Sequence, residues 1–309
     1  MDGLLTEIRY AGRHLARSPS FSILVILTLA LGIGATTAIF SVVNGVLLSD
    51  LPYPDADRLT RVRTHFQGRI SRSNAAANFL DYREQIESIE SVTTYRYQRL
   101  YLGDSPDPQF VLSADCSHEV FDVAGIQPVM GRGFTADDER SDANVVVISH
   151  GLWQSHFGGR TDVVGQKLSL DSQPYTVVGV TAAGFDFPSS GADVWRPLWF
   201  DVSATGLRTD HLYSVVARVK DGVSLEEAQA EFAAYGERII RQYPENYKDF
   251  QYGVSAVSLL EDRVGSVRTP LWILLAAVTF VLLIAVANVT NLMLVRAETR
   301  NPEPVSYTH

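Results

Sequence analysis

Two long apolar runs divide the chain into a short N-terminal segment, a large central segment and a short C-terminal segment. The first run lies within residues 19–49 and the second within residues 269–295, and neither contains a charged residue or a histidine. About 20 apolar helical residues cross a bilayer core of about 30 Å, so each run is long enough to span it. The pattern therefore predicts two transmembrane helices, 19–49 and 269–295.

The first run has an alternative interpretation as a cleaved signal peptide, whose positive region would contain Arg9, Arg13 and Arg17. Its apolar stretch extends over Phe21–Leu48. The apolar core of a signal peptide is only about 7–15 residues long. The length therefore favours a transmembrane helix.

Each apolar run carries a pattern that favours contact with another helix. In the first run the small residues Ala30, Gly34 and Ala38 are four positions apart, a spacing that lets helix backbones approach closely in membranes. In the second run the amides of Asn288 and Asn291 lie on one helix face and are expected to find hydrogen-bond partners there. Helix packing is the simplest use of both features, since no ionisable residue in either run indicates an ion path.

The orientation follows from the basic residues beyond the outer ends of the two runs. These are Arg9, Arg13 and Arg17 before the first run, and Arg296 and Arg300 after the second. The positive-inside rule then predicts a multi-pass inner (plasma) membrane protein with both termini in the cytoplasm and residues 50–268 in the periplasm. Apolar residues at helical spacing also predict an amphipathic helix at the cytoplasmic membrane surface over residues 1–18. The alternative is a helix packed on another domain.

Composition and charge exclude several classes of protein. The chain has 309 residues, 46% of them hydrophobic, and a formal net charge of −9, which argues against a nucleic-acid binder. The central segment holds 21 Lys and Arg against 31 Asp and Glu, a net charge of −10. The single cysteine, Cys116, forms no internal disulfide and is expected to be a small buried apolar residue.

The central segment shows alternating strand and helix patterns, which predict an α+β fold. Predicted strands are 59–64, 92–102, 110–116, 145–149, 167–170, 175–180, 213–219 and 252–257, and predicted helices are 78–86, 150–157 and 224–243. The last helix opens with a capping box, Ser224 to Glu227. We expect two subdomains, one formed by 50–116 with 209–268 and an inserted one over 117–208. The fold class is thus two transmembrane α-helices flanking a large α+β extracytoplasmic domain.

The motif search predicts no catalytic, cofactor-binding or metal site, so we expect no enzyme activity and no cofactor. The stretch nearest to a P-loop, Gly158–Lys167, lacks the Gly-Lys-Ser/Thr ending that cradles a phosphate. Four of the histidines in the central segment were considered as metal ligands, and they lack the required spacing: His118, His150, His156 and His211. The acidic loop of Asp137, Asp138, Glu139 and Asp142 is interpreted as a solvated turn rather than a calcium site. Trp153, Trp195 and Trp199 could line a binding surface, but core packing is the simpler expectation.

Ten segments in order resemble MacB/FtsX-type ABC permeases, closest to the acidobacterial duplicated orphan permease branch. They are Leu15–Phe21, Leu27–Ser41, Leu51–Pro54, Asn78–Arg83, Val129–Phe134, Gly151–Gln154, Phe157–Gly159, Pro174–Val180, Asp193–Leu198 and Ala287–Leu292. The resemblance implies a MacB-like periplasmic core domain in residues 50–268, in which the part formed by 50–116 with 209–268 is porter-like. It also implies a separate ABC ATP-binding subunit and a second permease half, as a homodimer or a duplicated repeat.

The resemblance further implies a function, with one departure from the family pattern. Family members couple ATP hydrolysis on another subunit to motion of the periplasmic domain, as exporters or mechanotransmission systems. The alternative is a membrane-anchored sensor or scaffold whose periplasmic domain binds a partner protein, as FtsX-like proteins do. Family members continue into further spans, whereas the sequence after Arg300 leaves the pattern, so we expect the chain to be a truncated permease with an artefactual tail.

Overall fold

The computed structural model describes residues 19–49, 51–103, 109–140, 143–188, 191–201, 206–247 and 251–298. The amphipathic helix predicted over residues 1–18 therefore lies outside the described residues, as does the tail after residue 298. The chain divides into two compact units. One contains the two long helices, and the other, which we call the extracytoplasmic domain, is Asp50–Arg263.

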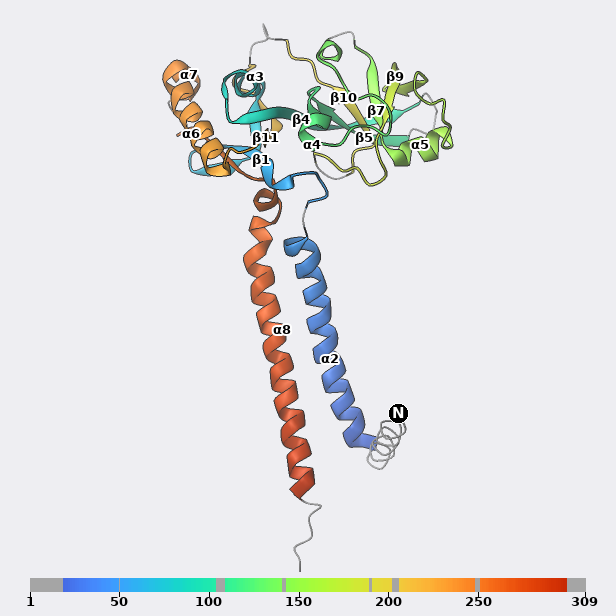
Figure 1. Cartoon of the computed structure of the whole chain (residues 1–309), viewed down its shortest axis with the longest axis vertical. Helices are drawn as coiled ribbons and strands as arrows, with labels where there is room; N and C mark the ends of the chain where they lie inside the picture. The colour runs from blue at the N-terminus through green and yellow to red at the C-terminus, as the bar shows by residue number, and fades with distance from the viewer. Residues whose placement is uncertain are drawn as a thin grey trace, which may run out of the picture. The chain divides into compact units, whose positions relative to one another are not determined.

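The helical unit contains the two predicted membrane helices. Helix α2 (Pro19–Val43) continues into a π-helical turn, η1 (Asn44–Leu48), and α8 (Leu259–Glu298) is 40 residues long (Figure 1). Among the described residues, two stretches are long and apolar enough to cross a membrane, Ser22–Leu48 and Leu259–Val295. Only 11% and 6% of their most apolar windows are buried, whereas the core helix of a soluble protein would be mostly covered. The prediction of two membrane-length helices is confirmed.

The closest approach between α2 and α8 uses a different glycine from the one in the predicted row of small residues. A Cβ atom on Gly32 would lie 2.8 Å from Cδ1 of Leu282, so only glycine fits there without a shift of that leucine. A Cβ atom on Gly34 would meet no atom within 4 Å, and Ala30, Gly34 and Ala38 are all exposed. Between these two helices the contact is therefore made by Gly32, and the row of Ala30, Gly34 and Ala38 stays uncovered.

The extracytoplasmic domain is built on one mixed sheet, which has 12 strands in the part of the chain that the structure describes. They are β1 (Leu59–Phe66), β2 (Arg69–Ser71), β3 (Ser73–Ala75), β4 (Ile89–Leu102), β5 (Gln109–Cys116), β6 (Met130–Gly131), β7 (Val145–Ile148), β8 (Lys167–Leu170), β9 (Gln173–Val180), β10 (Val194–Pro197), β11 (His211–Val219) and β12 (Gly253–Ser258). The order along the sheet is β12-β1-β11-β4-β5-β10-β7-β9-β6. Strand β2 pairs with β1, β3 pairs with β11, and β8 pairs with both β4 and β9.

Most strand pairs are antiparallel, and the exceptions lie in the middle of the chain. Strand β1 pairs antiparallel with both β11 and β12, and β4 pairs antiparallel with β11 and β5. The parallel pairs are β10 with β5 and β7 with β9. Because β1 and β12 are neighbours, the strands nearest the two membrane helices in sequence lie side by side.

Short helices cover the two ends of this sheet. They are α3 (Ala76–Gln85), α4 (Val120–Ala124), α5 (His150–Phe157), α6 (Leu225–Gln242) and α7 (Pro244–Tyr247), with 3₁₀ turns η2 (Ala56–Arg58) and η3 (Ala136–Asp138). Helices α6 and α7 lie together at one end of the domain and α5 at the other (Figure 1). Three apolar clusters form the core, centred on Trp195 and Phe121, on Phe79 and Tyr235, and on Ile148 and Leu168.

The predicted elements of the central segment are confirmed, with small shifts at their ends. Helix α5 has the predicted bounds, and its ends carry the expected signals, an N-cap bond from the Leu152 amide to Ser149 and a left-handed Gly158. The capping box of Ser224 and Glu227 is present at the start of α6. The strand predicted over 175–180 begins two residues earlier, since β9 starts at Gln173. The turn before it is therefore only Asp171-Ser172, both with positive φ, as tight hairpins require.

Candidate functional site

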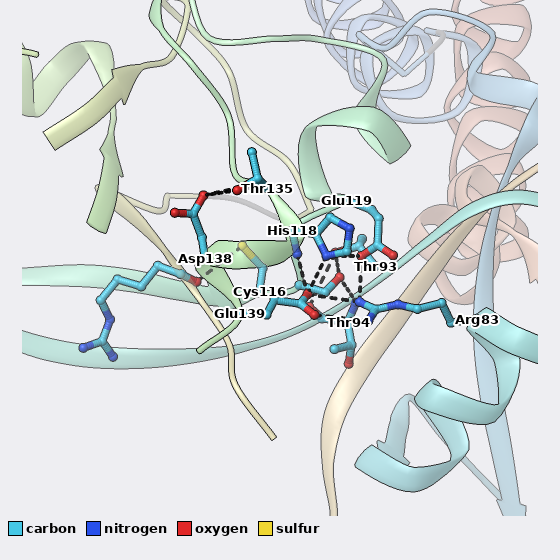
Figure 2. A network of polar contacts seen from close by, with 11 residues as sticks. Arg83, Thr93, Thr94, Cys116, His118, Glu119, Thr135, Asp138 and Glu139 are labelled. Atoms are coloured by element: carbon cyan, nitrogen blue, oxygen red, sulfur yellow. Dashed lines mark hydrogen bonds and ion pairs between the residues drawn. The ribbon is translucent and has the colours of Figure 1, made fainter. Parts of the chain in front are cut away.

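A group of four charged side chains lies where three segments of the extracytoplasmic domain meet. We call Arg83, His118, Glu119 and Glu139 the charged cluster (Figure 2). Arg83 comes from α3, His118 and Glu119 directly precede α4, and Glu139 directly follows η3. All four side chains are 14–25% exposed.

Arg83 holds the two glutamates of the charged cluster together. Its guanidinium donates to Oε2 of Glu119 at 2.8 Å and to both carboxylate oxygens of Glu139 at 3.0 and 3.1 Å. Its other side is occupied by the ring of Phe79, whose centroid is 4.6 Å from the guanidinium carbon. A fixed guanidinium fork that binds carboxylates in this way defines geometry as well as charge.

His118 closes the cluster from the opposite side. Its backbone amide donates to Oε1 of Glu139 at 2.7 Å, and its Nδ1 lies 2.9 Å from the same oxygen and 3.5 Å from Oε2 of Glu119. The preceding residue, Ser117, anchors this segment to β4 through its hydroxyl, which donates to Thr93 Oγ1 at 3.0 Å. The cluster therefore fixes the start of α4 against both β4 and α3.

Hydrogen bonding and charge shift the pKa values in the cluster. The contact with Glu139 raises the pKa of His118 above 6.5, although partial burial opposes this. Burial alone would raise the pKa of Glu139, but hydrogen bonds from His118 and Arg83 outweigh it and lower the pKa to about 2. At neutral pH the carboxylate of Glu139 is therefore expected to be ionised, with Arg83 beside it.

The cluster also brings together three side chains that could bind a metal ion, one histidine and two glutamates. The spacing of the histidines in the sequence did not predict this. Ligand atoms of His118, Glu119 and Glu139 all lie within 4.8 Å of one another. However, Arg83 already binds both carboxylates, so a cation would have to displace a guanidinium that neutralises them. This donor set fits a charge-balanced clamp better than a metal centre or an acid–base pair for catalysis.

The pKa shifts of the charged cluster predict a pH dependence of stability. Because the pKa of His118 is raised in the folded state, the stability that His118 contributes is fully present below pH 6.5. It is lost as the pH rises through the pKa of the folded state. Because the folded pKa of Glu139 is lowered, its contribution is present above pH 4.5 and is lost as the pH falls towards about 2. The cluster should therefore stabilise the domain most between about pH 4.5 and 6.5.

This dependence can be measured with His118→Gln. We expect the variant to lower the unfolding midpoint of the full chain in detergent by a few degrees at pH 5.5, corresponding to roughly 1 kcal/mol for a partly exposed pair. The difference from the unchanged chain should shrink at pH 9. His156→Gln is the matched control, because His156 is exposed and outside the cluster. An equal effect of both variants, or a difference that does not change with pH, would contradict the assignment.

A second candidate site is a cavity of about 520 Å³ in the extracytoplasmic domain, which we call the arginine cavity. Its lining residues are Tyr53, Arg61, Arg72, Tyr95, Arg96, Tyr97, Pro188, Leu212, Ser214, Leu259, Asp262 and Arg263. They include four arginines and a single carboxylate. The cavity is thus strongly cationic within a domain that is acidic as a whole.

Asp262 is the anion around which these arginines gather. Its carboxylate, 6% exposed, is 2.6 Å from Nη2 of Arg63, 2.9 Å from Nε of Arg72 and 3.4 Å from Nε of Arg61. Arg61 also donates to the hydroxyl of Tyr95 at 2.6 Å. One buried carboxylate therefore serves three guanidinium groups.

Several residues considered in the sequence have structural roles instead. Cys116 is fully buried, as expected, and burial raises the pKa of its thiol well above the usual value. Trp195 is also fully buried in the core, whereas Trp199 is 48% exposed. His150 lies at the start of α5 and is not near the charged cluster in sequence or in its contacts, and His211 packs against Phe66.

The interpretation of the acidic loop as a solvated turn is wrong for Asp138 and Glu139, whereas Asp137 is exposed. Asp138 is 8% exposed and accepts bonds from the amide and hydroxyl of Thr135, at 2.8 and 3.0 Å. It also pairs with both terminal nitrogens of Arg132, at 2.5 and 3.1 Å. Together with Glu139 in the charged cluster, these contacts make the loop part of the packed domain, while Asp142 lies outside the described residues.

The comparisons with known proteins agree with this architecture. A family model for the MacB-like periplasmic core domain matches residues 22–235, more than half of the chain. The chain belongs to this family. The predicted resemblance to MacB-type permeases is therefore confirmed, while the assignment to the acidobacterial branch stays a prediction.

Longer proteins with sequences similar to this chain are named as export proteins. The macrolide export ATP-binding/permease protein MacB of Burkholderia pseudomallei is 28% identical over 185 residues, which cover 59% of this chain and 27% of that protein. A Pseudomonas syringae pv. tomato protein named "Probable syringafactin export ATP-binding/permease protein SyfD" is 27% identical over 246 residues, covering 74% of this chain and 36% of that protein. The chain thus spans only about a third or less of the length of these relatives.

Solved structures share the fold of the extracytoplasmic domain. The periplasmic region of MacB from Actinobacillus actinomycetemcomitans matches with a TM-score of 0.50 at 14% identity, over 74% of this chain and 96% of that one. A permease-protein domain from Porphyromonas gingivalis matches with a TM-score of 0.50 at 19% identity, over 67% of this chain and 92% of that one. At these identities the likeness concerns the fold alone.

Proposed function

We propose that this chain forms part of the permease of an ABC-type exporter or mechanotransmission system in the inner membrane. The observation that carries the proposal is a MacB-like periplasmic core domain inserted between two membrane-length helices. In this proposal ATP hydrolysis takes place on an ABC ATP-binding subunit, as the names of the similar ATP-binding/permease proteins suggest. A second permease half would complete the unit, with both termini of this chain in the cytoplasm.

The chain connections suggest how motion would reach the domain. Strand β12 ends at Ser258 and α8 begins at Leu259, so no loop separates them. Strand β1, the first long strand after α2, pairs with β12 from Thr60↔Ser258 to His65↔Gly253. A displacement of α8 would therefore act directly on β12 and, through strand pairing, on β1.

The sheet order supports the proposed division into a porter-like part and an inserted part. The strands of residues 50–116 and 209–268 occupy one stretch of the sheet, β12-β1-β11-β4-β5, and those of 117–208 follow as β10-β7-β9-β6. The charged cluster joins the two parts, since Arg83 belongs to the first and Glu119 and Glu139 to the second. In this proposal the cluster keeps the two parts of the domain moving together.

The test is whether the chain controls an ABC ATPase. We expect the full chain in lipid nanodiscs to bind an ATP-binding subunit encoded in the same genome and to change its ATP hydrolysis rate several-fold. The baseline is the same subunit with empty nanodiscs and with an unrelated two-span protein. No binding and no change with any such subunit would contradict the proposal. Specific capture of a periplasmic protein by the domain in that case would favour the sensor or scaffold alternative.

A further inference from the structure

The arginine cavity carries more positive charge than its own carboxylate can balance. Its lining contains four arginines, Arg61, Arg72, Arg96 and Arg263, against Asp262 alone. Asp262 is further shared with Arg63, which lies just outside the lining. Arg96 has a second carboxylate within reach, Asp115, at 3.6 Å, but Asp115 is bound at both oxygens by Arg196. The cavity is therefore an electropositive concavity with room for an anion.

One of these arginines is buried with unused hydrogen-bonding capacity. Arg61 is 4% exposed, and its Nε makes no hydrogen bond among the described residues, although it lies 3.4 Å from Asp262. A buried donor without a hydrogen bond costs free energy that an added acceptor can recover. The cavity wall thus contains a buried donor that is close to a carboxylate but makes no hydrogen bond to it, and that an added acceptor could satisfy.

The rest of the lining fits an amphiphile better than a small free ion. Three phenol rings, Tyr53, Tyr95 and Tyr97, line the cavity together with Leu212 and Leu259. Leu212 is 61% exposed. Tyrosine and arginine beside exposed apolar side chains are typical of surfaces at the membrane–water interface, where rings and guanidinium groups contact headgroups.

The place of the cavity in the chain limits its distance from the membrane. Tyr53 follows Leu48, the end of the first span, by five residues, and Arg263 precedes Thr269, the start of the second apolar run, by six. Even fully extended, such segments reach only about 20 Å. Along the chain, both sides of the cavity are therefore only a few residues from a membrane-length helix.

We propose that the arginine cavity binds the phosphate group of an anionic phospholipid headgroup from the outer leaflet of the inner membrane. Arg61, Arg72, Arg96 and Arg263 supply the charge, and the tyrosines and leucines contact the glycerol and the first part of the acyl chains. A volume of about 520 Å³ lies within the range of about 300–1,000 Å³ that is usual for small-molecule sites. This site does not depend on the proposed export function.

The experiment uses the full chain in a non-ionic detergent and three probes. Dihexanoyl-phosphatidylglycerol, dihexanoyl-phosphatidylcholine and inorganic phosphate are titrated separately, and binding is followed by native mass spectrometry and by the unfolding midpoint. The test variant is Arg96→Gln with Arg263→Gln, which removes two charges from the lining. The matched control is Arg69→Gln with Arg99→Gln, which removes two charges from exposed strand positions outside the cavity.

The expected result is one phosphatidylglycerol per chain, at least 10-fold tighter than phosphatidylcholine. We expect at least 10-fold weaker binding by the test variant and unchanged binding by the control. The proposal would be overturned if the unchanged chain, the test variant and the control variant bound phosphatidylglycerol equally. It would also be overturned if the unchanged chain had equal affinity for both lipids. Inorganic phosphate that displaces phosphatidylglycerol at similar concentration would overturn the lipid as the source and leave a free-phosphate site. The ATPase measurement plays no part in these outcomes, so a failure here is distinct from a failure of the proposed function.

Discussion

Asp262→Asn is expected to lower the free energy of unfolding of the extracytoplasmic domain by about 3 kcal/mol or more. The substitution keeps the size of the side chain but removes the carboxylate that faces Arg61, Arg63 and Arg72. It leaves the buried Arg61 and the half-buried Arg63 without an anion, whereas Arg72 is 59% exposed. Removing one partner of a buried ion pair typically costs about 3–5 kcal/mol, much more than the net contribution of the pair. For a domain of this size the unfolding midpoint should fall by roughly 6–12 °C.

The measurement is thermal unfolding of the full chain in detergent, followed by near-ultraviolet circular dichroism. The matched control is Asp162→Asn, which breaks an Arg–Asp pair whose side chains are 66% and 58% exposed. Exposed pairs contribute little, so this control should leave the midpoint unchanged. If the two variants unfold at the same temperature, solvent screens the repulsion among the arginines around Asp262 even without the carboxylate. The inference that the arginine cavity is strongly electropositive would then lose its main support.

The elements of the domain could be predicted because their signals are local. Helix α6 begins where a serine and a glutamate three residues apart satisfy each other's amides, and α5 ends at a glycine that adopts a left-handed conformation. The two membrane helices follow from length and apolar composition alone. Such signals lie within a few residues of the element that they define, and the sequence displays them directly.

The two candidate sites could not be predicted because they depend on contacts between distant segments. Arg83 and Glu139 are 56 residues apart, and Arg72 and Asp262 are 190 residues apart. Acidic and basic residues in a single sequence indicate solvent exposure by default, which is why the loop containing Asp138 and Glu139 was predicted to be a solvated turn. The one available signal was the presence of Arg61 and Arg63 two positions apart in a predicted strand, since residues two apart share a face.

The structure also gives a physical reason for two of the family-like segments. Val129–Phe134 contains Gly131 and Pro174–Val180 contains Gly179, and these glycines are direct partners where β6 pairs with β9. A Cβ atom on Gly131 would lie 2.1 Å from the carbonyl oxygen of Val178, and one on Gly179 would lie 2.3 Å from the carbonyl oxygen of Arg132. The two segments therefore share a requirement for close backbone approach.

Because the two backbones lie so close, Gly179→Ala is expected to destabilise the domain by about 3 kcal/mol, the upper end of the range for overpacking. The added Cβ atom would clash with backbone atoms rather than with a movable side chain. Gly179 does not have a positive φ, so the effect would be steric rather than conformational. Gly253→Ala is the control, since Gly253 is also in a strand and its added Cβ would lie 3.6 Å from His65, an ordinary contact. We expect this control to change the unfolding midpoint by no more than about 2 °C, which corresponds to about 0.5 kcal/mol. Equal midpoints for the two variants would mean that β6 can move away from β9 at little cost, and that close approach does not explain why both segments contain glycine.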